Sequence, residues 1–243
     1  MVGMYKRLSV AFLILAACLM ESGCHGSKIL LSKFYSNQST EISLAQARQA
    51  LQDATPCCQS FADFSYEQFL PLRPQPFRLG IGSQVASLAG TRSYFLTFKL
   101  RSDVKLPYRV GLKSELNGHW IKDSYLLAPT VTLLDAGFQP IYTQDINLCE
   151  YMSWSSVNSG AFGSITVSDP KARYLVLYSS EKQQSSGTYW EQSPATFSFD
   201  TPTDLVSKGS FKVPHGPNGT IWIGLMTKGY AEAVKYGICG KPE

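Results

Sequence analysis

From about residue 77 to residue 225, apolar side chains recur at every second position, which is the period of a half-buried β-strand. In SYFLTFKL (93–100), Tyr94, Leu96, Phe98 and Leu100 are predicted to share the buried face. The same alternation predicts strands in FRLGIG (77–82), YRVGLKS (108–114), TVTLLD (130–135), SITVSD (164–169), TFSFD (196–200), SFKVP (210–214) and TIWIGL (220–225). RYLVLYSS (173–180) is apolar on both faces and predicts a central strand. Many short strands without intervening helices favour antiparallel sheets packed face to face.

Two turns separate predicted strands. Asp135-Ala136-Gly137 closes one of them. The segment His215-Gly216-Pro217-Asn218-Gly219 contains an Asn-Gly pair, which predicts a β-hairpin between its flanking strands.

One short helix precedes the strands. Thr40 is a suitable N-cap for residues 41–53, where Leu44, Ala47, Ala50 and Leu51 recur at helical intervals. The Thr55-Pro56 step ends the helix, because a proline disfavours helical geometry in the residue before it. The predicted fold is mainly β: an antiparallel two-sheet sandwich, jelly-roll-like, with a short N-terminal helix. A mostly closed barrel is the alternative.

Composition agrees with one packed domain. The 243 residues are 44% hydrophobic and only 16% charged, whereas soluble domains average about 25% charged residues. This excludes a coiled coil, a collagen-like chain and a wholly disordered chain. With 22 Lys and Arg against 18 Asp and Glu, the charge balance gives no support to nucleic-acid binding.

The N-terminus is typical of a secreted lipoprotein. MVGMYKR followed by LSVAFLIL has the basic and apolar regions of a signal peptide, and its apolar run is too short for an ordinary membrane span. Leu15-Ala16-Ala17-Cys18 resembles the bacterial lipobox, which implies a thioether-linked diacylglycerol on Cys18. Ser22-Gly23-Cys24 is the alternative, although the charge of Glu21 disfavours it. Ordinary signal cleavage near Ala17, with both cysteines inert, is the third option.

These patterns predict a domain order and a location. Residues 1–17 are expected to be a lipoprotein signal peptide, residues 18–40 a tether and residues 41–243 a single body. Neither lipidation site is followed by Asp, which resembles the outer-membrane sorting pattern of Gram-negative lipoproteins. We therefore expect a periplasmic protein whose acyl chains hold it to the outer membrane.

The six cysteines do not settle the lipidation site. If Cys18 is lipidated, the mature chain keeps an odd number of other cysteines, so they cannot all pair with one another. If Cys24 is lipidated, four cysteines remain that can pair: Cys57, Cys58, Cys149 and Cys239. The adjacent Cys57 and Cys58 are compatible with a vicinal disulfide, with bridges to Cys149 and Cys239, or with two buried thiols. They lack the C-x-x-C spacing of a redox site or a zinc ligand pair.

The order of elements resembles the MalM family, the periplasmic products of maltose operons and their lipoprotein relatives. The resemblance covers residues 44–185 and rests on ALQDATPCCQSFADFSYEQF, FRLGIGSQVASLAGTRSYFLTFKL, LLAPTVTLLDAGFQPIY and ARYLVLYSSEKQ. It implies periplasmic residence and an accessory role in carbohydrate transport of the maltodextrin type, with no reaction attached.

Catalytic motifs are scarce. The three histidines, His25, His119 and His215, have no metal-ligand spacing and are expected in the tether or in exposed loops. The sequence contains no G-x-S-x-G nucleophile motif. Glu150, Glu181 and Glu191 lie near predicted strand ends and are expected to be solvated turn residues. We predict no catalytic residue, no metal and no cofactor; a secreted carbohydrate-active hydrolase with paired carboxylates is the alternative.

The tryptophans favour a binding module. Trp222 alternates within a strand and is expected in the core, whereas Trp154 and Trp190 are flanked by polar residues that indicate loops. A solvent-facing indole can stack on the C–H face of a sugar, so Trp154 and Trp190 are the candidate sugar-stacking residues. The expected partners are the membrane, through the lipid anchor, and a carbohydrate or an outer-membrane porin. A purely structural or interaction role in the envelope is a further alternative.

Overall fold

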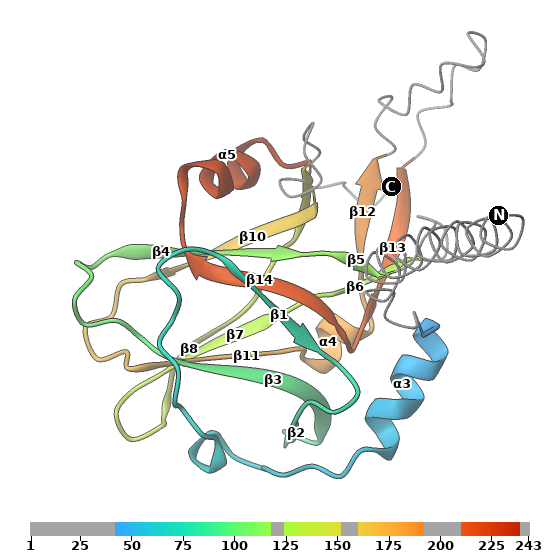
Figure 1. The fold of residues 1–243 in the computed structure, drawn as a ribbon, viewed down its shortest axis with the longest axis horizontal. Helices are drawn as coiled ribbons and strands as arrows, with labels where there is room; N and C mark the ends of the chain where they lie inside the picture. Colours follow the sequence, from blue (N-terminus) through green and yellow to red (C-terminus); the bar gives the residue numbers. More distant parts are fainter. Residues whose placement is uncertain (1–41, 118–123, 152–159, 192–209, 239–243) are drawn as a thin grey trace, which may run out of the picture. The chain divides into compact units, whose positions relative to one another are not determined.

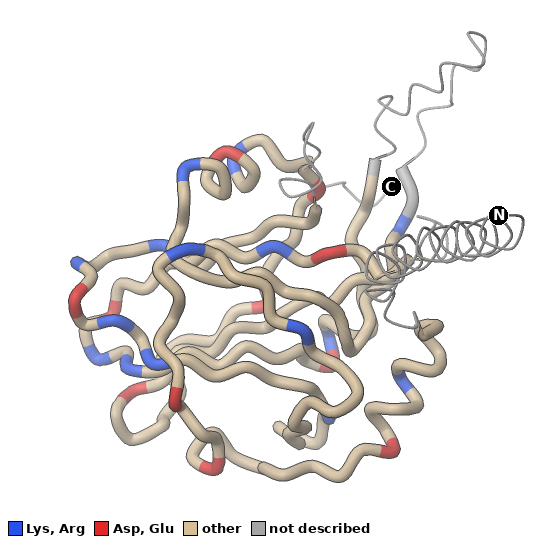
Figure 2. The backbone as a smooth tube through the Cα atoms, in the orientation of Figure 1, with Lys and Arg blue, Asp and Glu red and all other residues tan. Residues whose placement is uncertain are grey.

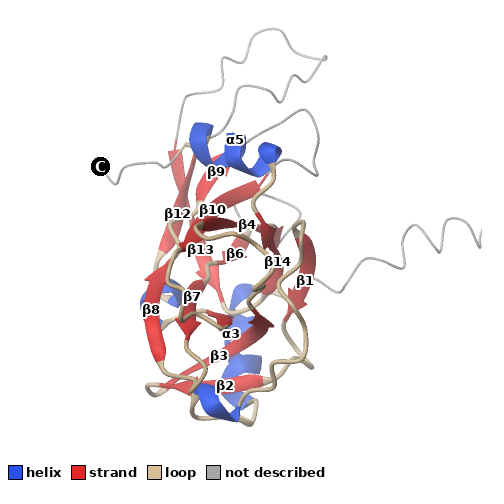
Figure 3. Ribbon diagram, turned by 90° about the vertical axis from the view of Figure 1, so that its left-hand side faces the viewer, coloured by secondary structure: helices blue, strands red, loops and turns tan. Residues whose placement is uncertain are grey.

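Two five-stranded sheets pack face to face, which confirms the predicted mainly β, antiparallel sandwich (Figures 1 and 3). This architecture is seen in a computed structural model that describes residues 42–117, 124–151, 160–191 and 210–238. Residues 42–243 belong to one structural unit, separate from residues 1–41. The candidate lipidation sites Cys18 and Cys24, the tether and His25 lie outside the described residues.

The first sheet has the strand order β1-β14-β4-β10-β9, and all its pairs are antiparallel. Its strands are β1 (Gln75–Leu79), β4 (Tyr108–Ser114), β9 (Cys149–Tyr151), β10 (Gly160–Val167) and β14 (Gly219–Leu225). As predicted from alternation, Tyr108, Val110 and Leu112 of β4 point into the core.

The second sheet has the order β2-β3-β11-β7-β8. Its strands are β2 (Val85–Leu88), β3 (Thr91–Lys99), β7 (Thr130–Leu134), β8 (Pro140–Asp145) and β11 (Tyr174–Tyr178). The segment apolar on both faces, β11, is indeed the central strand, paired with β3 and β7. Leu175 and Leu177 face the core between the sheets, while Val176 faces a second apolar cluster on the outer side.

A third, smaller sheet has the order β12-β13-β6-β5. Its strands are β5 (Leu116–Asn117), β6 (Tyr125–Leu127), β12 (Gly187–Glu191) and β13 (Ser210–Gly216). The pair β13–β6 is parallel. The predicted hairpin at Asn218-Gly219 is therefore wrong: β13 pairs with β12 and β6, whereas β14, which follows directly, pairs with β1 and β4. The chain crosses from one sheet to another at this turn.

Short helices flank the sheets. Helix α3 (Leu44–Asp53) confirms the predicted N-terminal helix but begins later than expected, because Ser43 and not Thr40 is its N-cap. The Ser43 hydroxyl accepts a hydrogen bond from the Gln46 N–H at 3.3 Å, and the Gln46 side chain accepts one from the Ser43 N–H at 2.9 Å. The other helical segments are the 3₁₀ turn η1 (Phe61–Asp63), α4 (Glu181–Gln184) and α5 (Lys228–Tyr236). None of the described helices is both long and apolar enough to span a membrane.

Helix α5 was not predicted from the sequence. Its N-cap is Thr227, whose hydroxyl accepts a hydrogen bond from the Tyr230 N–H at 3.4 Å. It packs on the outer face of the first sheet, where Gly111 of β4 leaves room for the Tyr230 ring: a Cβ at position 111 would lie 2.9 Å from Tyr230 Cδ1. The helix thus covers the side of the first sheet that faces away from the core.

Candidate functional site

A groove of about 730 Å³ runs over the outer face of the second sheet. It lies between the start of η1, with the two residues before it, and the turn that joins β7 to β8, and it continues toward α4. Residues 59–62 form one wall, Phe138, Gln139 and Pro140 form the other, and Tyr178 and Thr143 lie between them. Three half-buried aromatic rings, those of Phe61, Phe138 and Tyr178, therefore combine with amide and hydroxyl groups in one depression.

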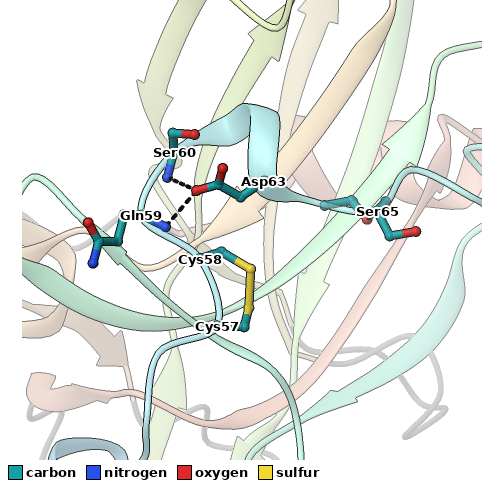
Figure 4. The surroundings of a disulfide bond; sticks show 7 residues. Cys57, Cys58, Gln59, Ser60, Asp63 and Ser65 are labelled. Atoms are coloured by element: carbon teal, nitrogen blue, oxygen red, sulfur yellow. Dashed lines mark hydrogen bonds between the residues drawn. A yellow bond between two sulfur atoms is a disulfide. The ribbon is translucent and has the colours of Figure 1, made fainter.

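The first wall is attached to the edge of β2. The Cys57 N–H donates to the Val85 carbonyl at 2.9 Å, and the Ser87 N–H donates to the Cys58 carbonyl at 2.9 Å. Through these bonds Cys58 forms a parallel bridge with Ala86. Cys57 and Cys58 are joined to each other in a vicinal disulfide (Figure 4). These contacts fix the chain immediately before the residues that line the groove.

Asp63 holds the same wall from its other end. Figure 4 shows its carboxylate accepting the N–H groups of Gln59 and Ser60, at 2.9 and 2.8 Å. These backbone hydrogen bonds lower the pKa of Asp63, because they stabilise the charged carboxylate. Asp63 therefore has a structural role: its carboxylate stabilises the wall by accepting these two backbone N–H groups.

The opposite wall is a tight turn closed by Asp135. The Asp135 carboxylate accepts N–H groups from Gly137 and Gln139, at 2.8 and 2.9 Å. Between these donors, Phe138 has a φ of 60°, and its ring stacks on Tyr66 and Tyr174 at centroid distances of 5.3 and 5.0 Å. The turn therefore presents an aromatic ring at the rim of the groove.

Backbone strain in the described residues is concentrated at this groove. Among them, only Ala89 (φ 49°) and Phe138 (φ 60°) adopt the left-handed region without being glycine. Both line the groove, Ala89 at the turn between β2 and β3 and Phe138 at the turn between β7 and β8. Such conformations cost about 1–3 kcal/mol each and occur preferentially at binding and catalytic sites. The position of this strain identifies the groove as the candidate site.

The polar end of the groove is organised by Asp145. Its carboxylate accepts hydrogen bonds from Thr130 and Ser180 at 2.6 and 2.9 Å and lies 3.3 Å from Lys182 Nζ. Partial burial raises the pKa of Asp145, but the two hydroxyl donors and the Lys182 ammonium outweigh it and leave the pKa below its usual value. Ser180 and Lys182 are thereby held at the groove while Asp145 stays outside it.

A second hollow of about 680 Å³ adjoins the first. The two share Ala89, Thr91 and Glu181, so they form one continuous surface depression from Phe138 to α3. Arg48 and Gln52 of α3 line the far part. Among the described residues that line either hollow, Glu181 is the only one with a carboxylate.

The structure places the predicted sugar-stacking residues elsewhere. Trp190 is only 3% exposed and belongs to the main core on β12, so the prediction that its ring faces solvent is wrong. Its polar sequence neighbours belong to a paired strand and not to a loop. Trp154 and Cys239 lie outside the described residues, as does His119. Phe61, Phe138 and Tyr178 were missed because no local pattern distinguishes a groove-lining ring from a core ring.

Trp222 and His215 also differ from expectation. Ile221 and Ile223 take the core side of β14, so the half-buried Trp222 faces outward, where its Nε1 donates to Glu115 Oε1 at 2.5 Å. Lys113 Nζ lies 3.4 Å from the same oxygen and 4.7 Å from the centre of the Trp222 ring. Burial lowers the pKa of Lys113, and this effect is larger than the opposite effect of the Glu115 carboxylate, which raises the pKa.

His215 is not an exposed loop residue. It is 5% exposed in β13, and its ring nitrogens lie 2.9 Å from the Thr188 hydroxyl and 2.8 Å from the Gln183 carbonyl. Burial lowers its pKa, which favours the neutral imidazole. Its role is to join β12, β13 and α4.

The three glutamates have different environments. Glu150 is 2% exposed, so the prediction of a solvated turn residue is wrong for it. Glu181 is exposed in the first turn of α4, as predicted, and the Glu191 side chain lies outside the described part of the structure. Within the described ranges, no three His, Cys, Asp or Glu side chains lie close enough together to hold a metal ion.

Cys149 is also disulfide-bonded. It is 8% exposed on β9, and the next residue, Glu150, forms an antiparallel bridge with Ile238, with N–H to carbonyl distances of 3.0 and 2.7 Å. Cys149 therefore takes part in a cross-link that is separate from the Cys57–Cys58 bond.

No protein-family model, curated protein or solved structure gives a significant match to this chain.

Proposed function

We propose that this chain is a periplasmic lipoprotein, anchored to the outer membrane, that binds an oligosaccharide of the maltodextrin type in the groove of the second sheet and does not cleave it. Its role would be that of a MalM-like accessory component of carbohydrate transport. The observation that carries the binding proposal is the groove itself, with three half-buried rings set among amides and hydroxyls and with the strained turns at Ala89 and Phe138 on its rim.

The chemistry of the groove fits a sugar. Aromatic faces complement the C–H face of a pyranose ring, and Gln59, Gln139 and Ser180 supply donors and acceptors of the kind that sugar hydroxyls bind. Most glycosidases need two carboxyl groups on opposite sides of the glycosidic bond. The single carboxylate of Glu181 among the described lining residues therefore supports binding over hydrolysis.

The binding site can be tested with Phe138→Gly. Glycine accepts the φ of 60° at this position, so the variant removes the ring without adding backbone strain. We expect it to weaken binding of a maltodextrin by about fivefold in calorimetric titration, since one aromatic contact of this kind is worth about 1 kcal/mol.

Tyr236→Ala is the matched control, because it removes an aromatic ring that is 62% exposed on α5, outside the groove. Equal affinities for Phe138→Gly and the parent chain would exclude the groove as the site. Failure of every maltodextrin to bind would overturn the binding proposal, and the appearance of shorter products would favour the hydrolase alternative.

The anchor is tested by Cys18→Ser. The Leu-Ala-Ala-Cys run predicts that this variant loses its acyl chains and appears in the soluble periplasmic fraction after membranes are washed with high salt. Metabolic labelling with palmitate measures the same event directly. Labelling that persists in Cys18→Ser and disappears in Cys24→Ser would assign the anchor to Cys24. Absence of label from the parent chain would contradict the proposal of a lipid anchor.

A further inference from the structure

One end of the sandwich is strongly basic. Segments 99–109 and 169–173 together carry six Lys and Arg residues and two Asp, whereas the whole chain has 22 basic and 18 acidic residues. Figure 2 shows Lys and Arg gathered at the end of the body opposite α3. The six basic residues are Lys99, Arg101, Lys105, Arg109, Lys171 and Arg173.

Strand register brings these two segments together. Lys99 at the end of β3 is paired with Tyr174 at the start of β11, and the Leu100 N–H donates to the Arg173 carbonyl at 2.7 Å. On the first sheet, Arg109 of β4 is paired with Thr166 of β10. The loops β3–β4 and β10–β11 therefore emerge at the same end of the molecule, and we call them, with Phe69, the basic end.

Most of this charge is available to a partner. Lys105, Arg109, Lys171 and Arg173 are exposed. Within the described part of the chain, Arg101 is the only one of the six with a carboxylate in ion-pair range, at 2.8 Å from Asp103. Arg173 donates to the Pro170 and Ala172 carbonyls at 2.7 and 2.9 Å, which orders its guanidinium without neutralising it.

An exposed apolar side chain lies beside this charge. Phe69 is 57% exposed. Phe69 forms a parallel bridge with Lys99, and its ring centre lies 5.8 Å from both Lys99 Nζ and Arg101 Cζ. A protruding ring flanked by two cations is suited to the boundary of a bilayer, where the ring enters the acyl region and the cations meet the phosphates.

We propose that the basic end docks on a membrane surface rich in anionic lipid. The combination decides between partners. Uncompensated cations alone fit any polyanion, but an exposed Phe within the same surface gains free energy only where there is an apolar phase to enter. This contact is separate from the groove and adds a second, reversible membrane contact to the proposed anchor.

The test uses residues 25–243, the chain without the predicted signal peptide and without both candidate acylation sites, so that neither an apolar leader nor an acyl chain contributes to membrane binding. It should sediment with vesicles that contain phosphatidylglycerol and not with vesicles of phosphatidylcholine alone, and binding should fall as salt is raised. In this background, Lys105→Gln with Lys171→Gln should reduce partitioning about 30-fold, because each cation near an anionic surface contributes about fivefold. Phe69→Ser should reduce it about tenfold.

Helix α5 offers matched controls, since Lys228 and Lys235 are exposed cations and Tyr236 is an exposed ring beside Lys235 Nζ, at 4.9 Å. Lys228→Gln with Lys235→Gln, and Tyr236→Ser, should leave vesicle binding unchanged. Equal losses from the α5 and basic-end variants, absence of binding to phosphatidylglycerol vesicles at low salt, or retention by an anionic polysaccharide without vesicle binding would each overturn the proposal. Thermal unfolding of every variant confirms that it is folded.

Discussion

Removal of the disulfide at Cys149 is expected to lower the free energy of unfolding by roughly 4–5 kcal/mol. We expect its partner to be Cys239, because the residues next to the two cysteines, Glu150 and Ile238, form a backbone bridge. A bond between them closes a loop of about 90 residues, and loss of a cross-link of that length restores several kcal/mol of conformational entropy to the unfolded chain. The measurement is urea unfolding of Cys149→Ala with Cys239→Ala, and peptide mapping without reduction identifies the bonded pair.

The vicinal disulfide provides the control. Cys57 and Cys58 are adjacent, so their bond closes no loop between distant parts of the chain. Cys57→Ala with Cys58→Ala should therefore change the free energy of unfolding by only about 1 kcal/mol, most of it from lost contacts of the buried Cys58. A large loss from the vicinal variant together with a small loss from the Cys149 variant would contradict both assignments.

The strands were predictable because their signal is local. Alternation correctly assigned the inward residues of β3 and β4, and the run of apolar residues on both faces correctly placed β11 in the centre of its sheet. The outer face of β11 is covered because residues 58–66 return over it and contribute Cys58, Phe64 and Tyr66 to the second apolar cluster. The period and the composition of a segment are sufficient to assign a strand and its buried face where that strand packs against the core.

Turn chemistry was a poorer guide. Asn218-Gly219 has the local signal of a hairpin, yet tertiary pairing sends β13 and β14 into different sheets. The predicted exposed loop around Trp190 failed because its polar neighbours concealed a strand: β12 pairs antiparallel with β13, the next strand along the chain. A dipeptide encodes a turn, but it does not encode which strands the turn connects.

The groove could not be predicted because no segment contains it. Its walls come from residues near 60, 90, 140 and 180, which only the order of strands in the second sheet brings together. The sequence does carry one hint, the Asp135-Ala136-Gly137 turn, whose next residue is the ring-bearing Phe138. The left-handed conformation of that residue becomes apparent only in the folded chain.

Trp190→Ala is expected to lower the free energy of unfolding by about 3–5 kcal/mol, because it removes a large side chain that is 3% exposed in the core. For a chain of this length the loss corresponds to a decrease of about 10 °C in the midpoint of thermal unfolding. Trp190→Phe should recover much of the loss, since it keeps an aromatic ring in the same place. Tyr236→Ala, at an exposed position, should leave the midpoint almost unchanged.

The same variant distinguishes a core role for Trp190 from a sugar-stacking role. A buried indole supports the body and makes no contact with a ligand, so Trp190→Ala that is still folded at low temperature should bind maltodextrin with the affinity of the parent chain. Phe138→Gly should show the reverse order of effects, with weaker binding and a smaller loss of unfolding free energy than Trp190→Ala, because the Phe138 ring is only half-buried. If Trp190→Ala instead kept its stability and lost binding, the stacking platform would lie on β12, and the groove over the second sheet would lose its assignment.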